Sequence, residues 1–106
     1  MSEFTTKIQV SKNADFKQVY ATGIQGGHTP FDFRIAFHNE SVNLEESIPG
    51  EKIVIDRDFK VEVILSPFAA KKVMLWLKRH VEDYEEQYGE IKTQKPAEIE
   101  KLEYIT

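Results

Sequence analysis

The chain has 106 residues, of which 41% are hydrophobic and 30% are charged, and its formal net charge at pH 7 is -4. This composition is typical of one soluble globular domain, with room for a modest core and a size that gains from oligomerisation. The acidic balance argues against binding to nucleic acid, which requires clustered Lys and Arg. Because the sequence has no Cys, disulfide scaffolds, thiol catalysis and cysteine zinc sites are excluded. The sequence shows no apolar leader and no run long enough to span a membrane, so we expect a cytoplasmic protein without a membrane partner.

The first third of the chain predicts three strands. Residues 4–10 alternate apolar and polar side chains and predict a half-buried strand, followed by a turn-like break at 11–14. Residues 16–25 predict a second strand, and the glycine pair with Pro30 in 26–30 predicts a connector. Residues 31–37 alternate aromatic with smaller or polar side chains, so we expect an antiparallel hairpin around the connector.

The middle of the chain predicts a loop and further strand. Residues 38–50 are polar and end in Pro-Gly, which favours a loop with a short edge segment near 42–44. Residues 53–55 and 59–65 are rich in β-forming residues. Their spacing fits either one long bent strand or two short ones.

A long helix follows between Ser66 and Ile91. Ser66 is a favourable N-cap, Pro67 suits the first helical position, and Gly89 favours a stop. Apolar residues spaced four and three apart form one stripe along it: Ala70, Met74, Leu77, Val81, Tyr84, Tyr88 and Ile91.

Taken together, these patterns predict an α+β fold. We expect an antiparallel sheet of about four strands, followed by one long C-terminal helix packed on the sheet. Residues 1–91 form the single compact domain in this interpretation, and 92–106 form a polar tail that is flexible or a short helix.

The first half of the helix carries more apolar surface than one sheet covers. Residues 73–77 are five consecutive apolar residues and surround nearly the whole helix. A second copy of the chain is the expected second cover, whereas the alternative is that Trp76 and Leu75 pack under the tail or the 38–50 loop. The predicted interface residues are Met74, Leu75, Trp76, Leu77, Val81, Tyr84 and Tyr88.

Charge along the helix is segregated against the helix dipole. Basic residues occupy the first half and acidic residues the second, so neither end is stabilised by its own charges. An antiparallel partner helix would place each basic half beside an acidic half, with Lys71 near the partner's Glu85 and His80 near its symmetry mate. A solvated charged face is the alternative.

No pattern of chemical residues predicts an active site or a metal site. His28, His38 and His80 lack the spacing of metal ligands, so we expect no metal and no cofactor. His28 with Asp32 is the one acid–base candidate, although an Asp after a Pro turn more often bonds to local backbone. The residues 28–33 are therefore a possible structural or partner-binding motif, with His28, Phe31, Asp32 and Phe33 as its members.

Four short motifs occur in the order known from one family. They are Val19-Tyr20-Ala21, His28-Thr29-Pro30-Phe31-Asp32-Phe33, Ser66-Pro67 with Ala70-Lys71, and Tyr84-Glu85-Glu86-Gln87-Tyr88-Gly89-Glu90-Ile91. Over residues 17–91 the chain resembles the domain of unknown function 3467 family of small prokaryotic proteins, with Thr22 where Asn is common and Tyr88 for the usual Phe. The resemblance implies one compact domain, and the family has no established activity to carry over to this chain. The layout is also similar, by architecture alone, to SecB-like export chaperones.

The sequence therefore predicts a non-enzymatic, cytoplasmic protein–protein interaction module that forms a homodimer or a higher oligomer and binds an unidentified protein partner. The alternatives are a SecB-like holdase for unfolded or toxin-type clients, with an apolar groove near Phe31, Phe33 and Phe37, and a small-ligand enzyme that uses His28 and Asp32.

Overall fold

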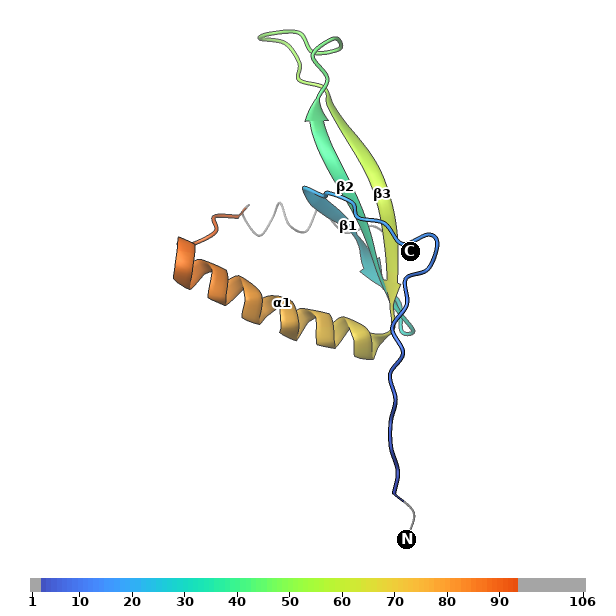
Figure 1. Ribbon diagram of the computed structural model, residues 1–106. Helices are drawn as coiled ribbons and strands as arrows, with labels where there is room; N and C mark the ends of the chain where they lie inside the picture. Colours follow the sequence, from blue (N-terminus) through green and yellow to red (C-terminus); the bar gives the residue numbers. More distant parts are fainter. Residues whose placement is uncertain (1–2, 94–106) are drawn as a thin grey trace.

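The computed structural model describes residues 3–93 and contains one antiparallel sheet followed by one long helix (Figure 1). In this part of the chain the elements are β1 (Gly23–His28), β2 (Phe33–Val42), β3 (Ile55–Leu65) and α1 (Pro67–Tyr88). The strands lie in the order β1-β2-β3. The α+β class is confirmed, but the described residues form three strands rather than about four, because 4–10 pairs with no other strand.

The register of the strands separates two faces of the sheet. Residues directly opposite each other on antiparallel strands share a face, so Ile24, Phe37 and Val61 lie on one side. We call this the apolar face; its members are Ile24, Phe33, Ile35, Phe37, Val61, Val63 and Leu65. We call the opposite side the His38 face; it carries Gln25, Ala36, His38, Phe59 and Glu62. A register shift lies between Phe37, which pairs with Val61, and His38, which pairs with Phe59. Because of this shift, Val61 lies on the apolar face and Phe59 on the His38 face.

Several strand boundaries differ from the sequence prediction. β1 begins at Gly23 instead of residue 16 and includes the glycine pair, so the connector is only the turn that Thr29 and Asp32 close. Gly26 belongs in the strand because a Cβ there would lie 2.0 Å from the carbonyl oxygen of Arg34. β2 continues to Val42, which absorbs part of the predicted edge segment near 42–44.

In the region after β2, the structure has the first of the two alternatives, one long strand. β3 runs without interruption from Ile55, whereas Ile53 lies outside it. The isolated bridge between Ile48 and Lys52 closes the tip of the intervening loop.

The helix has the predicted start and nearly the predicted end. The Ser66 hydroxyl accepts a hydrogen bond from the Ala69 amide at 3.1 Å, and Pro67 occupies the first turn. Gly89, with φ of 101°, ends α1, and its amide donates to the Glu85 carbonyl. Ile91 lies beyond the helix, where its amide donates to the Glu85 carboxylate at 2.9 Å.

The helix does not pack on the sheet of its own chain. It leaves the end of β3 and projects away from the strands (Figure 1), and none of its residues is buried. The molecule is therefore extended, with principal dimensions of 77 × 35 × 29 Å and a radius of gyration of 19.1 Å. A compact chain of this length has a radius of gyration of about 13 Å. The expectation of a helix packed on the sheet is wrong for the single chain.

The polar tail predicted for 92–106 lies mostly outside the described residues, which end at Thr93.

Candidate interaction surface

Within residues 3–93, the predicted interface residues of α1 are largely uncovered. Trp76 is 57% exposed and Leu75 54%, which contradicts the alternative in which the 38–50 loop covers them; the alternative cover, the tail, lies mostly outside the described residues. Met74, Leu77, Tyr84 and Tyr88 are exposed to a similar extent, and Val81 is half-buried. Helices in folded proteins gain most of their stability from packing of an apolar side, and α1 has no such packing within the described residues.

Contacts on α1 are local, along the helix itself. The rings of Trp76 and His80 lie 4.3 Å apart, and those of Tyr84 and Tyr88 lie 4.9 Å apart. One ion pair, Lys78 with Glu82 at 4.0 Å, joins the basic and acidic halves. The first turn has no acidic residue and the last turn no basic residue, so the dipole of α1 is uncompensated by its own side chains. The exposed surface of α1 therefore combines apolar side chains with a basic half and an acidic half, and both are available for contact with another molecule.

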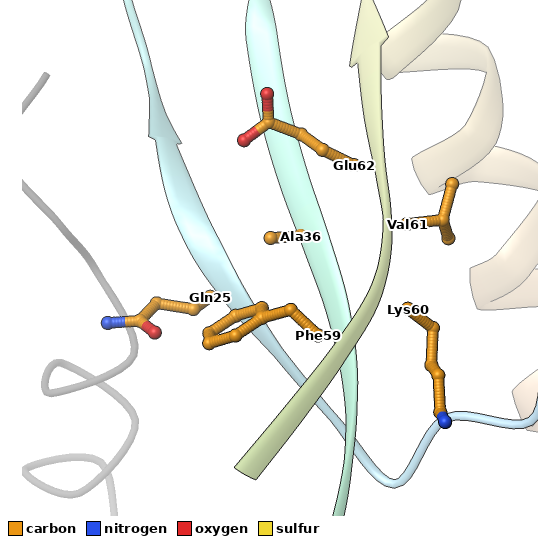
Figure 2. A pocket seen from close by; sticks show the side chains of 6 residues that line it. All are labelled: Gln25, Ala36, Phe59, Lys60, Val61 and Glu62. Atoms are coloured by element: carbon orange, nitrogen blue, oxygen red, sulfur yellow. The ribbon is translucent and has the colours of Figure 1, made fainter.

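The apolar face of the sheet is also incompletely covered. Phe33 and Val63 are each 37% exposed, and Ile24 is 42% exposed. Val61 points to the side on which α1 lies, opposite to Phe59 and Gln25 (Figure 2). On the opposite side, the His38 face, a shallow open hollow of about 510 Å³ lies beside Gln25, Ala36 and Phe59.

The predicted acid–base pair of His28 and Asp32 does not form. The Asp32 carboxylate accepts a hydrogen bond from the Thr29 hydroxyl at 3.0 Å and from Arg34 Nε at 3.4 Å. The Thr29 hydroxyl in turn accepts from the amides of Phe31 and Asp32. His28 stacks on Phe33 instead, with ring centroids 5.6 Å apart. The motif 28–33 thus builds a turn, and Phe31 stands 83% exposed at its tip.

The buried residue that sequence reasoning missed is His38. It is 2% exposed between Gly23 of β1 and Phe59 of β3, whose ring it meets edge-on at 5.2 Å. A Cβ on Gly23 would lie 2.5 Å from His38 Cε1, so the glycine provides the space for the imidazole. The alternation of β2 indicates that His38 shares a side with Ala36, but only the register places Gly23 opposite.

A small polar group surrounds His38. Its Nδ1 lies 3.8 Å from Glu40 Oε1. That carboxylate oxygen accepts a hydrogen bond from Arg57 Nε at 2.8 Å and forms an ion pair with Arg57 Nη2 at 2.7 Å. Among the described residues, neither ring nitrogen of His38 has a hydrogen-bond partner. Thr22, Glu40 and Arg57 line an open hollow of about 610 Å³ beside the imidazole. Both imidazole nitrogens are buried, so the ring presents no accessible nitrogen to this hollow.

Other site types find little support in residues 3–93. No group of three or more His, Asp or Glu residues in this part of the chain is arranged to hold a metal ion. None of its helices combines the length and the apolar character needed to cross a bilayer.

Comparison with known proteins gives one match. A family model described as protein of unknown function (DUF3467) matches residues 2–93. No curated protein and no solved structure matches the chain. Because the match covers most of the 106 residues and includes the four motifs, the chain belongs to the DUF3467 family.

Proposed function

We propose that this protein is a cytoplasmic, non-enzymatic interaction module that assembles with further copies of itself through α1. The observation that carries the proposal is the exposure of α1: Leu75, Trp76 and Leu77 are each at least 50% exposed in one chain. Burying Leu75 and Trp76 together stabilises an assembly by about 3–5 kcal/mol at the usual area coefficient. That energy is comparable to the whole stability of many small domains.

Surface area supports the same proposal. The chain exposes 10137 Å², whereas a compact monomer of its mass exposes about 6,100 Å². Obligate dimers bury about 2,000–5,000 Å² in total, half of it on each copy. The excess of about 4,000 Å² per chain is larger than such an interface requires.

Sedimentation equilibrium at micromolar concentration tests the proposal. We expect a dimer or a larger species for the native sequence and monomers for Trp76→Glu, because a carboxylate cannot be buried in the apolar contact. Gln87→Glu adds the same charge at an exposed position outside the predicted interface and serves as the matched control. The Trp76 side chain is mostly exposed in one chain, so the variant should retain the sheet and its circular dichroism. A monomeric native protein would overturn the proposal.

A holdase for unfolded chains is the second candidate, and the half-exposed apolar face of the sheet favours it. A holdase binds many unrelated clients through apolar surface of this kind. The purified protein at equimolar concentration should then suppress aggregation of a heat-unfolded reporter enzyme. An interaction module of the first kind leaves that aggregation unchanged, and affinity capture from the native cytoplasm returns one dedicated partner.

A further inference from the structure

We propose that residues 4–10 of each chain form an additional strand on the free edge of β3 in a second copy. This inference rests on the proposed self-assembly and deepens it, because it names a second contact besides α1. We call residues 4–10 the N-terminal arm.

The arm is an extended segment without a partner among residues 3–93. Phe4, Ile8 and Val10 are 92%, 82% and 90% exposed. Residues 3–11 form no hydrogen bond and no ion pair with the rest of the described chain. Their alternation nevertheless matches a strand with one apolar side. A strand of this kind is stable only beside another strand, so the arm requires an acceptor edge.

The arm lies away from the edges of its own sheet. It extends beyond the end at which β1 and β3 finish, and residues 11–22 then lead to Gly23 at the opposite end (Figure 1). The turn at Asn13, where the Phe16 amide donates to the Asn13 carbonyl, does not fold the arm back into a hairpin. A second copy is therefore the acceptor that the geometry favours.

Between the two edge strands, β3 offers the better acceptor. β1 has six residues and three of them are glycines, which provide few cross-strand contacts. β3 has 11 residues, and in the described part of the chain it pairs with one strand, β2, along one edge. The arm is about 23 Å long at 3.3 Å per residue, which equals the length of residues 59–65.

Matching side chains strengthen this choice. The apolar side of the arm needs apolar neighbours. β3 provides them on the apolar face, where its alternate residues are Val61, Val63 and Leu65. Placed on this edge, the apolar side of the arm extends the apolar face from three strands to four. An uncovered apolar edge of this kind otherwise promotes uncontrolled association, and reciprocal exchange between two copies closes it.

Hydrogen–deuterium exchange tests the strand itself. We expect amides of residues 4–10 to exchange at least 10-fold more slowly in the assembled protein than after dilution to monomers. Fast exchange of the arm in an assembled protein would overturn the inference and leave the contact through α1 standing. A protein that is monomeric at every concentration contradicts both.

Two neighbouring substitutions test which side of the arm is buried. Ile8→Glu places a charge on the apolar side and should raise the dissociation constant about 10- to 100-fold. Gln9→Glu adds the same charge on the opposite side of the arm and should change the dissociation constant less than about 3-fold. Equal effects of the two variants would contradict a strand with one buried side.

Cysteine cross-linking identifies the acceptor, since the native chain has no Cys. Mixing Ile8→Cys protein with Val61→Cys, Val63→Cys or Leu65→Cys protein permits a disulfide between different copies of the two variants. We expect at least one of these mixtures to yield that mixed disulfide, and the mixture with Ile24→Cys on β1 to give none. Cross-linking to Ile24→Cys alone would place the arm on β1 and overturn the assignment to β3. If none of the four mixtures cross-links, the assignment is also wrong.

Discussion

β2 and α1 differ in how far the chain covers them. β2 has a strand on each side, and the two buried residues of the described chain, Ala36 and His38, both belong to it. α1 has 22 residues, against 10 in β2, and none of them is buried. Its backbone hydrogen bonds are satisfied within the helix, so α1 can form before its side chains find a partner, whereas β2 depends on its neighbours. β2 is thus paired on both edges by its own chain, whereas α1 has no packing partner within the described residues.

The largest effect should follow from disturbing the sheet at Gly26. In Gly26→Ala the new Cβ would approach the Arg34 carbonyl oxygen to 2.0 Å, so β1 must move away from β2. We expect a loss of about 2–4 kcal/mol in the free energy of unfolding, measured by urea denaturation. Gly50→Ala is the control: it has open space but a φ of 79°, and should lose about 1 kcal/mol. If the two losses are equal, tight pairing of β1 does not hold the sheet together.

A smaller effect is expected at the start of α1. Ser66→Ala removes the hydroxyl that accepts from the Ala69 amide, which should destabilise α1 by about 1 kcal/mol. Ser66→Asp preserves an acceptor and adds a favourable charge at the helix N-terminus, so it should match the native stability. Helical circular dichroism during thermal unfolding measures both variants. A large loss for Ser66→Ala would mean that α1 depends on its cap more than on a partner.

Reversing a charge on α1 should change the dissociation constant of the assembly by a few-fold. If two α1 helices run antiparallel, Lys71→Glu weakens assembly about 3- to 10-fold, and raising salt from 50 to 500 mM weakens the native protein similarly. Glu85→Lys added to Lys71→Glu should restore the affinity. Because the Glu85 carboxylate also accepts from the Ile91 amide, Glu85→Gln alone must be measured for comparison. No restoration would contradict the antiparallel arrangement.

The sequence predicted those parts of the fold that depend on neighbouring residues. Both ends of α1 are fixed within one turn by Ser66 and Gly89, so local patterns located them. The tendency of Asp32 to bond locally was also predictable, and its bonds to Thr29 keep it from His28.

The parts that were missed depend on residues distant in sequence. β1 was placed too early because its position is set by pairing with β2, through which Gly26 and Gly27 enter the strand. The burial of His38 requires Gly23 and Phe59 on both sides, and no local pattern shows this. The packing of α1 on the sheet was predicted from its apolar stripe, but a stripe identifies a buried side without identifying the chain that buries it.

The smallest effect is expected at His38, although it is the most buried residue described. Both ring nitrogens lack a hydrogen-bond partner in the described chain, so the imidazole contributes packing while its polar atoms oppose burial. His38→Leu keeps a similar volume and removes those atoms, but also the edge-on contact with Phe59. Removing the unpaired polar atoms stabilises the protein and losing the contact with Phe59 destabilises it, each by about 1 kcal/mol. We therefore expect the free energy of unfolding to change by less than about 1 kcal/mol.

The outcome at His38 also tests whether residues 3–93 supply all the contacts of this β2 residue. His28→Leu is the control, since His28 is exposed and only stacks on Phe33. If His38→Leu loses more than about 3 kcal/mol by urea denaturation while His28→Leu does not, the imidazole has a hydrogen-bond partner outside residues 3–93. In that case β2 and α1 differ less, because β2 would then also take part of its stability from outside the described residues.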